Sequence, residues 1–532
     1  MMVDFSSLVC ADGRIVLSFA ANRERDAFFA ASMIIDVLAQ KVRLAATPGP
    51  PALLRVHIGD TADFVFENTT HSDRCLVVRR PVSQSDTTVT FESSPWSACS
   101  PVLIPGLGWA EGNPGETVLP SDRGAILSRD GGIWCLNADL PGVFGREVLR
   151  HDRANGNIPA LLASILVLRA ALVRMGLLPD GADRATSLIT VDAEDQQRYF
   201  MNRYGKCSNI RGAPSDDLLF AKSCRTIMDR CESFGAKAVF MVTGDELDPS
   251  FRDAFGDQLV GLEDNRRVLN EIVQRGHDIA CHGFDHEWWV ARGYAANQPM
   301  TLAQKIAYFA RTSGDLRTLF GLIRFVLRHA RLLHYARAAK RRREQARNTP
   351  FTYTEMRQDI ERWIALVGFN AKQFLIRYPG YVRSAATLEF LDDRFAATVD
   401  SSDLYDLAAN LPAYPYRLLM ERNGCLRRTR VTEIPCIWID ELLRTRSAQH
   451  IEADLSRLRG LAAFPGSVLS LVTHTKVLGA DYDHCHLYLH DPLRGMALPI
   501  VESAWQQFGE FLASRTRSCN WRDLQAILVV PE

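Results

Sequence analysis

The sequence predicts an α/β protein whose larger part is built from parallel βα units. From about residue 185 onward, short apolar strands such as SLITVDAED and AKAVFMVTG alternate with amphipathic helices such as NRRVLNEIVQRG. Strands of this kind are buried on both faces, which is typical of a parallel sheet covered by helices. The chain has 532 residues, more than one domain usually holds. A barrel and an open doubly wound sheet both fit this pattern.

Residues 1–184 follow a different pattern and are predicted to form a separate α+β domain. It contains strand-like runs and a helical run that are separated by Pro/Gly clusters. The strand-like runs are LLRVHIGD, TTVTFES and GGIWCLN, and the helical run is RERDAFFAASMIIDVLAQ. No group of residues in this region indicates a chemistry, so its role stays open. The Pro- and Gly-containing tract at residues 175–187 marks the boundary, and residues 185–532 form the second domain.

The most hydrophobic segment is IPALLASILVLRAALVRMGLLP, which starts at Ile158. Arg169 lies near its centre and Arg174 follows soon after. Charges at these positions would be costly in the middle of a bilayer. The segment is therefore predicted to be a buried helix rather than a membrane span.

Composition indicates an enzyme of the cytoplasm. Lys+Arg and Asp+Glu both number 62, so no net charge attracts the chain as a whole to nucleic acid, and we expect no nucleic-acid partner. The 12 cysteines are scattered without a C-x-x-C pair, which favours reduced thiols. The start, MMVDFSSLVCADGR, lacks a basic segment followed by an apolar core, so we expect no export.

A basic helical insertion interrupts the βα pattern at about residues 311–347. It holds eleven Lys or Arg residues against two acids, Asp315 and Glu344. Apolar residues recur at three- and four-residue steps, while most arginines lie on the opposite side, as in an amphipathic helix. Such a helix fits peripheral contact with an anionic inner membrane face. A lid that packs on the second domain with a solvated basic face is the alternative.

Two histidines lie four residues apart in GHDIACHGFDHEWW, at His282 and His286. With this spacing both imidazoles can bind one ion if the chain forms a helical turn or a tight loop. Two nearby histidines are also commonly structural. The apolar run before them resembles a buried strand, however, and βα barrels build active sites at the carboxyl ends of their strands. The pair is therefore a candidate metal site.

Three carboxylates follow another apolar strand in ITVDAED, at Asp192, Glu194 and Asp195. Acids crowded together repel one another unless a cation offsets their charge, which favours a functional cluster over solvated loop residues. Asp192 and Glu194 share a strand face, whereas Asp195 reaches the same ion only after a turn. Glu194 is slightly favoured as the acidic metal ligand, and Asp195 stays open.

Six motifs over residues 188–475 occur in the order found in one enzyme family. TVDAED is similar to an aspartate motif written T-V-D-x-E-D, and GHDIACHGFDH closely matches G-H-E-I-x-x-H-G-x-x-H. The others are KAVFMVTG, FLIRYPGYVRS, ATVDSSD and SLVTHT. The chain thus resembles polysaccharide deacetylases of the NodB-homology carbohydrate esterase superfamily. The resemblance implies a distorted (β/α) barrel over residues 185–532, and residues 1–184 lie outside it.

The resemblance also implies catalytic roles. Asp192 matches the base that takes a proton from the attacking water, and Arg377 matches the arginine that orients this base and keeps it ionised. His474 matches the general acid that protonates the leaving amine. His282 and His286 match two ligands of one divalent ion, with Glu194 or Asp195 as the third. The ion is expected to be Zn, with Co, Mn or Ni as alternatives.

Substrate contacts are expected beside Arg377 and behind the histidine motif. The backbone N–H of Gly380 or Tyr381 would help to stabilise the tetrahedral oxyanion. Tyr378 and Tyr381 suit sugar stacking, although aromatic residues near a strand end also serve as core. Trp288 fits either a pocket wall or a packing role.

These features predict a metal-dependent N-deacetylase that hydrolyses the acetamide of an acetylated sugar in surface polysaccharide or glycolipid synthesis. Without export, a lipid-linked or nucleotide-linked sugar at the inner membrane face is the accessible substrate. One alternative is an amidase or cyclic imide hydrolase with the same metal site, since the motifs recognise the amide rather than its surroundings. The other is a catalytically silent glycan-binding or membrane-associated scaffold.

Overall fold

The computed structural model describes most of the predicted strands and helices. The described residues are 2–3, 15–19, 23–44, 54–58, 74–92, 96–112, 115–149, 157–178, 185–193, 220–250, 262–285, 288–289, 351–368, 373–381, 383–444, 447–464, 466–475 and 502–519. The basic segment predicted at about 311–347 lies outside them, so its fold stays a prediction.

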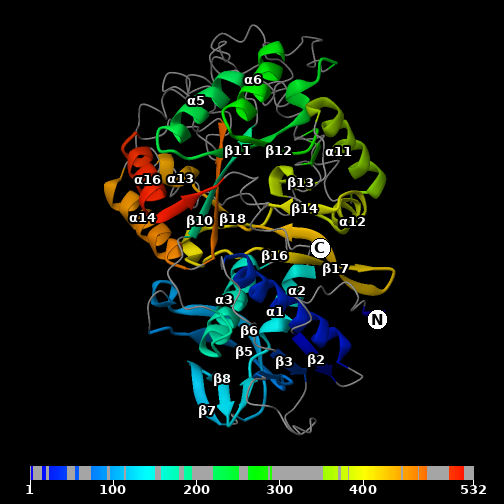
Figure 1. Cartoon of the computed structure of the whole chain (residues 1–532), viewed down its shortest axis with the longest axis vertical. Helices are drawn as coiled ribbons and strands as arrows, with labels where there is room; N and C mark the ends of the chain where they lie inside the picture. Colours follow the sequence, from blue (N-terminus) through cyan, green and yellow to red (C-terminus); the bar gives the residue numbers. More distant parts are fainter. Residues whose placement is uncertain are drawn as a thin grey trace, which may run out of the picture.

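The larger of the two main sheets has twelve strands, and every pair is parallel except β16 with β17 (Figure 1). The strand order is β1-β17-β14-β13-β12-β11-β10-β19-β18-β15, with β16 also beside β17 and β20 beside β10. The strands are β1 (Met2–Val3), β10 (Ala185–Ala193), β11 (Ala238–Val242), β12 (Asp278–Cys281), β13 (Gln373–Ile376), β14 (Ala397–Asp400), β15 (Leu404–Tyr405), β16 (Tyr416–Arg422), β17 (Cys425–Glu433), β18 (Cys436–Trp438), β19 (Val468–His474) and β20 (Thr516–Ser518). The predicted α/β class is confirmed.

The two ends of this strand order are connected by the chain itself. β14 continues through residues 401–403 into β15, and β17 continues through residues 434–435 into β18. These two connecting segments lie side by side, because the Ile434 N–H donates to Asp400 O at 2.9 Å. The sheet therefore bends back toward itself. Within the described residues, β1 and β15 are not paired with each other.

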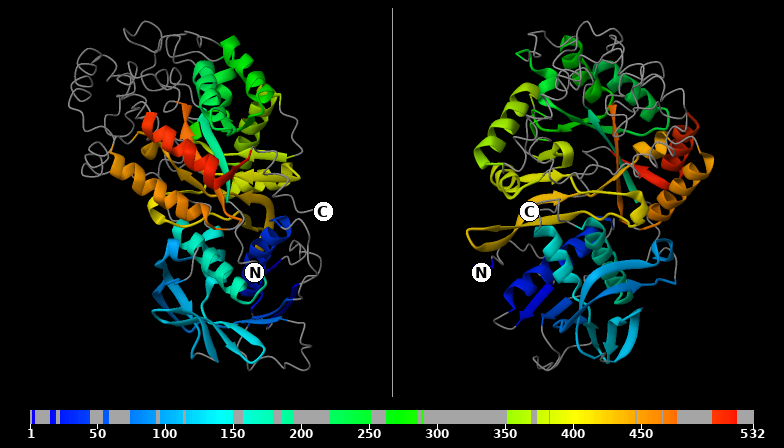
Figure 2. Two further views of the ribbon diagram at one scale, coloured as in Figure 1. Left: turned by 60° about the vertical axis from the view of Figure 1, so that its left-hand side comes forward. Right: turned by 180° about the vertical axis from the view of Figure 1, so that it is seen from behind.

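Helices surround this sheet, as Figure 2 shows from two sides. They are α5 (Phe220–Glu232), α6 (Leu262–Gln274), α11 (Tyr353–Val367), α12 (Ala385–Arg394), α13 (Asp440–Arg444), α14 (Ala448–Ala462) and α16 (Glu502–Arg515). Short 3₁₀ turns link several elements: η4 (Trp96–Cys99), η6 (Gly244–Leu247), η7 (Pro379–Tyr381) and η8 (Leu407–Ala409). Because helices cover the sheet, the central strand β10 is buried at all nine residues, as its apolar sequence predicts.

The second main sheet lies wholly within the first 184 residues. Its order is β2-β3-β4-β9-β8-β7, with the first four strands parallel and β8 and β7 antiparallel. The elements are β2 (Ile15–Phe19), β3 (Leu54–Ile58), β4 (Arg74–Val78), β7 (Glu116–Ser121), β8 (Gly124–Asp130), β9 (Ile133–Leu136), a separate hairpin of β5 (Ser83–Val89) and β6 (Val102–Trp109), and helices α1 (Glu24–Leu44), α2 (Leu140–Leu149) and α3 (Ile158–Arg174). The predicted mixture of strands and helices is present.

The apolar segment at Ile158 forms α3, which is buried over most of its length. Asn157 caps its first turn by accepting from the Ala160 N–H at 3.1 Å. Arg169 is only 2% exposed, and its guanidinium carbon lies 4.7 Å from the ring centroid of Tyr414, which partly offsets its desolvation. None of the described helices has the length and apolar character needed to cross a membrane.

The strand pairing crosses the predicted boundary at residue 184 at one point. β1 lies at the start of the chain but pairs with β17 of the larger sheet. Helix α1 also contacts this end of the sheet, because the Arg417 N–H of β16 donates to the buried Asp36 carboxylate at 3.0 Å and Arg428 of β17 forms an ion pair with it. Packing therefore joins the first 184 residues to the larger sheet through β16 and β17 (Figure 1).

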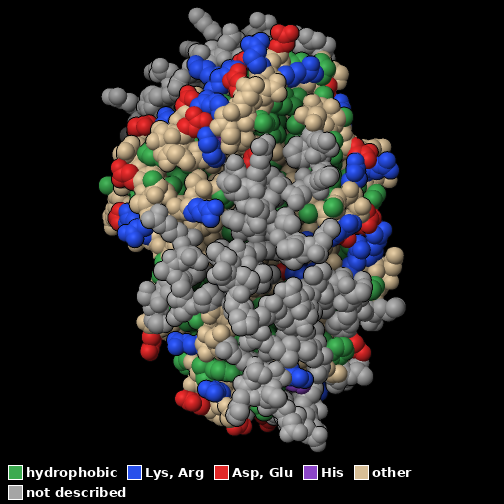
Figure 3. All heavy atoms as spheres, viewed as in Figure 1, with side chains coloured by type: hydrophobic (Ala, Val, Ile, Leu, Met, Phe, Trp, Pro, Cys, Tyr) green, Lys and Arg blue, Asp and Glu red, His purple; other side chains and the backbone are tan. Residues whose placement is uncertain are grey.

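Charged side chains are mixed on the visible surface. In Figure 3, basic and acidic groups are interspersed over the region of α5 and α6. Several of them form ion pairs, such as Arg225 with Asp264 at 2.8 Å and with Glu271 at 2.6 Å. This face therefore carries no large patch of one sign among the described residues.

Candidate active site

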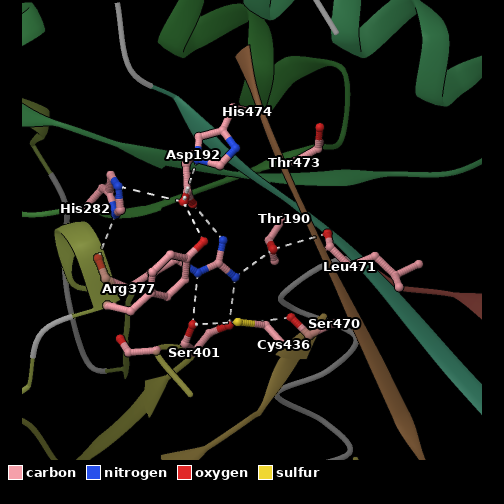
Figure 4. A network of polar contacts seen from close by, with 12 residues as sticks. Thr190, Asp192, His282, Arg377, Ser401, Cys436, Ser470, Leu471, Thr473 and His474 are labelled. Atoms are coloured by element: carbon pink, nitrogen blue, oxygen red, sulfur yellow. Dashed lines mark hydrogen bonds and ion pairs between the residues drawn. The ribbon is translucent and has the colours of Figure 1, made fainter. Parts of the chain in front are cut away.

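The carboxyl ends of four parallel strands bring the predicted catalytic side chains together. Asp192 on β10 lies directly opposite His474 on the neighbouring β19. On the other side of β10, β12 and β13 end in register at Cys281 and Ile376, and the residues that follow are His282 and Arg377. Neighbouring parallel strands have their carboxyl ends on the same side of the sheet, so residues far apart in sequence meet there. Figure 4 shows Asp192 between His282 and His474, above the guanidinium of Arg377.

Asp192 is 1% exposed and directs its two oxygens to different groups. Oδ1 accepts from Arg377 Nη1 at 2.7 Å. Oδ2 accepts from the Tyr381 hydroxyl at 3.2 Å and lies 3.9 Å from His282 Nε2 and 3.7 Å from His474 Nε2. One oxygen is therefore held by a fixed cation, while the other faces both imidazoles.

Arg377 is fully buried, and its donors are used by neighbouring strands. Nε donates to Ser401 O at 2.9 Å, and Nη2 donates to Thr190 Oγ at 2.7 Å and to Ser401 Oγ at 2.8 Å. Burial would lower the pKa of Arg377, but the charge of Asp192 and other neighbours raise it above its usual value. The guanidinium is thus a permanent charge that keeps Asp192 oriented, and Thr190 and Ser401 are supporting residues that the sequence did not reveal.

His282 has a defined tautomer because of its backbone partner. Its Nδ1 lies 2.8 Å from the carbonyl oxygen of Arg377. A carbonyl can only accept, so Nδ1 carries the proton and Nε2 keeps its lone pair on the side of Asp192 when the ring is neutral. A histidine ligand of a metal is commonly oriented in this way by a backbone acceptor. The donor chemistry at His282 therefore fits a divalent ion.

The remaining predicted ligands lie outside the described residues: they are Glu194, Asp195 and His286. Within the described part of the chain there is no cluster of three or more histidine, cysteine or acidic residues able to hold a metal. The three-ligand set and the choice between Glu194 and Asp195 stay predictions.

His474 is anchored differently, by a carboxylate. Its Nδ1 lies 2.7 Å from Asp440 Oδ2, while Asp440 Oδ1 accepts from the Thr473 hydroxyl at 2.7 Å. Asp440 is fully buried and follows β18, the strand beside β19. The indole of Trp438 lies over the imidazole, with ring centroids 4.6 Å apart. Sequence reasoning missed Asp440 and Trp438, although an acid directly after the apolar run CIWI is the same signal that identified Asp192.

The turn after Arg377 has an unusual backbone. Gly380 and Tyr381 have φ values of 62° and 59°, and the second is uncommon for an aromatic residue. The Tyr381 N–H donates to Tyr378 O at 2.8 Å, so it is occupied by the turn and the prediction that it stabilises an oxyanion is not supported. The Gly380 N–H remains the candidate. The Tyr381 contact with the site is its hydroxyl, and burial raises the pKa of this phenol well above its usual value, so it stays a donor.

The other aromatic candidates pack within the protein. Tyr378 is fully buried, with its ring centroid 5.1 Å from that of Trp289, so it is core rather than a sugar platform. Trp288 contacts Trp289 and Phe351 edge-on, at centroid distances of 5.6 and 5.3 Å. These contacts indicate that Trp288 packs against other aromatic rings, and its contact with substrate stays a prediction.

Comparisons with known proteins give weak likenesses. No family model matches the chain, and no curated protein matches it. A putative polysaccharide deacetylase from Mycobacterium smegmatis is 13% identical, with 66% of this chain and 96% of that chain covered at a TM-score of 0.29. A polysaccharide deacetylase from Bacillus cereus is 10% identical, with 64% and 94% covered at 0.27. A carbohydrate esterase family 4 pseudoenzyme from Bacillus anthracis is also 10% identical, with 65% and 66% covered at 0.27.

Proposed function

We propose that this protein is a divalent-metal-dependent N-deacetylase that hydrolyses the acetamide of an acetylated sugar. The observation that supports this function most is the environment of Asp192 Oδ2. This oxygen faces His474 Nε2 at 3.7 Å and His282 Nε2 at 3.9 Å, while Arg377 holds the other oxygen. A carboxylate between two imidazoles that are anchored by different groups suits hydrolysis, which needs a base, an acid and a cation.

Asp192 and His474 act as the base and the acid. Asp192 Oδ2 takes a proton from the attacking water, since Oδ1 is already paired with Arg377. The Asp440 carboxylate orients His474 through Nδ1, and an Nε2 proton of His474 goes to the departing nitrogen. One proton is taken from water and one is given to the amine, so acetate and a free amino sugar result.

His282 acts as a metal ligand in this proposal. Its Nε2 would hold the ion together with His286 and either Glu194 or Asp195. The ion, Zn or else Co, Mn or Ni, would polarise the amide carbonyl as a Lewis acid. The proposal is supported by the Nδ1 contact with Arg377 O, which fixes the orientation of the ring.

The finer features of the fold and substrate are also part of the proposal. The curved sheet corresponds to a distorted (β/α) barrel over residues 185–532, with residues 1–184 as an added α+β unit. The substrate is a lipid-linked or nucleotide-linked acetylated sugar used for surface polysaccharide or glycolipid, and residues 311–347 hold the enzyme at the inner membrane face.

Deleting residues 311–347 should weaken sedimentation with anionic liposomes in moderate salt; unchanged sedimentation would exclude this contact.

Acetate release from a panel of N-acetylated sugars, free, nucleotide-linked and lipid-linked, tests the function. We expect release by the wild-type protein that stops after chelation and returns when Zn is restored. Asp192→Asn and His282→Ala should both abolish it. Opening of cyclic imides without acetate release would favour the amidase alternative, and turnover that persists in both variants would refute the site.

A further inference from the structure

The loop after β12 is held by a carboxylate from a distant helix. Asp359 on α11 is 9% exposed and accepts three hydrogen bonds from this loop. Its Oδ2 accepts from the Phe284 N–H at 2.8 Å and from Trp289 Nε1 at 2.9 Å, and its Oδ1 accepts from the Asp285 N–H at 3.3 Å. Three donors from one loop thus converge on a single side chain 70 or more positions away in the sequence.

The opposite side of the same loop is fixed by η6. The Gly244 N–H donates to Gly283 O at 3.0 Å, and the Asp245 N–H donates to Phe284 O at 2.9 Å. The carbonyl groups of Gly283 and Phe284 therefore face η6, while the N–H groups of Phe284 and Asp285 face Asp359. Residues 283–285 are therefore held by hydrogen bonds from both sides.

Gly283 allows the indole that completes this arrangement. Its φ is 72°, and a Cβ there would lie 2.6 Å from Trp289 Nε1, closer than any side chain tolerates. The Trp289 ring packs on Phe351 and Tyr378, with centroids 4.9 and 5.1 Å away. Trp289 is therefore buried among aromatic rings and directs its indole N–H to Asp359.

The supporting helix is itself rigidly placed. α11 begins with a capping box between Thr352 and Glu355 and ends at Gly368 in the left-handed conformation. The Trp363 indole N–H donates to Val242 O at the end of β11 at 2.7 Å. Arg362 stacks on the Phe284 ring, with its guanidinium carbon 3.8 Å from the centroid. Asp359 thus reaches the loop from a helix that is tied to the neighbouring strand.

We propose that Asp359 is a positioning residue for the metal site: its carboxylate fixes the loop that bears the two histidines. In the sequence, His282 lies two residues before Phe284, and His286 lies between Asp285 and Trp289; Phe284, Asp285 and Trp289 all contact Asp359. We call the three hydrogen bonds to Asp359 the clamp. The role of Asp359 in metal binding rests on the proposed function, whereas the clamp rests on these hydrogen bonds alone. Residues that orient metal ligands from behind commonly contribute about 10–100-fold to metal affinity.

Asp359→Asn tests the clamp most directly, because asparagine has nearly the same volume as aspartate and differs mainly in its hydrogen bonding. An amide offers one acceptor oxygen and two donors, so it cannot accept on both sides from three N–H groups. Trp289→Phe is a milder second variant that keeps a ring and removes one donor, in case the first fails to fold. Asp454→Asn is the matched control, since Asp454 is 4% exposed on α14 and contacts Arg457 away from the site.

Two measurements on the full-length protein test the inference. In competition with a chromophoric chelator, Zn affinity should fall about 10–100-fold in Asp359→Asn and remain unchanged in Asp454→Asn. Amide hydrogen exchange of Phe284 and Asp285 should accelerate by about tenfold or more in Asp359→Asn, because their acceptor is lost. Trp289→Phe should show a smaller loss of Zn affinity.

The two readouts separate the clamp from the proposed function. Unchanged exchange at Phe284 and Asp285 in Asp359→Asn would refute the clamp. Accelerated exchange with unchanged Zn affinity would refute its role in positioning the metal site. Accelerated exchange in a protein whose wild type binds no Zn would refute the metal assignment and leave Asp359 as the residue that holds the loop.

Discussion

At the residue scale, the partner of each histidine Nδ1 decides what its Nε2 can do. His282 Nδ1 contacts the backbone carbonyl of Arg377, which can only accept, so in the neutral ring the proton lies on Nδ1 and Nε2 can act as a ligand. His474 Nδ1 contacts the Asp440 carboxylate, which fixes the orientation of the ring and leaves Nε2 facing Asp192. Both rings face Asp192 Oδ2 but differ in the partner of Nδ1, and this difference is the reason for proposing a metal ligand on one side and an acid on the other.

Changing Asp440 to Asn should therefore impair the acid and not the ligand. An amide carries no negative charge beside His474 and can turn its NH₂ group toward the ring, so we expect kcat for deacetylation to fall by about 100-fold with little change in KM. Zn affinity should stay at the wild-type value. Steady-state kinetics and a chelator competition on the same preparation check both statements, and a kcat within twofold of the wild type would remove Asp440 from the mechanism.

Within the site, the sequence revealed the residues that end the strands but not those that support them. Asp192, His282 and Arg377 follow short apolar runs, and this local pattern is visible in one dimension. Asp440 carries the same pattern, yet its partner His474 lies on a neighbouring strand that sequence order does not identify, since β18 stands between β15 and β19. Asp359 carries no local signal, because a carboxylate in an amphipathic helix usually faces solvent.

At the element scale, strand type and helix amphipathicity were predictable, whereas the contacts that bend the sheet between β14 and β15 were not. Parallel strands were expected from apolar runs between helices, and β10, β11 and β12 confirm them. The bend at which β14 becomes β15 depends on side-chain contacts between distant segments. Arg383, 4% exposed, pairs there with Glu433 at 2.7 Å and with Asp400 at 3.1 Å. No periodicity in the sequence encodes such a contact.

The end of α5 provides a pH-dependent test of how the βα units are joined. Glu232 accepts from Arg275, which directly follows α6, and from His277 before β12. The Arg275 hydrogen bond lowers the pKa of Glu232 to about 2, below the usual 4.5. Because the folded state holds the ionised form, this stabilisation is present above pH 4.5 and is lost as the pH falls toward 2.

The Tm of Glu232→Gln should therefore lie below that of the wild type at pH 6, and the gap should narrow at pH 3.5. Thermal unfolding of both proteins at the two pH values measures this. A gap that widens on acidification would show that Glu232 does not act through its charge.

At the scale of the whole molecule, the first 184 residues and the larger sheet share a buried interface. Asp36 and Arg428 are 8% and 9% exposed and form an ion pair between α1 and β17. Burial raises the pKa of Asp36, while Arg428 opposes this shift. The chain is therefore expected to unfold in one cooperative transition rather than as two independent units.

Removing Asp36 should leave Arg428 buried without its carboxylate. We expect Asp36→Ala to lower the free energy of unfolding by about 3 kcal/mol or more. Asp26→Ala on the same helix is the control, since its pair with Arg23 is on the surface and should contribute less than about 1 kcal/mol. Urea unfolding followed by circular dichroism compares the two variants. An equal loss in their free energies of unfolding would contradict a stabilising buried contact between α1 and β17.

The central claim is that His282 binds a divalent ion beside the Asp192 carboxylate, and the metal content of the purified protein tests it most directly. After incubation with Zn and removal of free ion, mass spectrometry of the metal should find about one equivalent in the wild type and almost none in His282→Ala. A folded wild type with no bound ion, or a His282→Ala protein that keeps the full equivalent, would contradict the account.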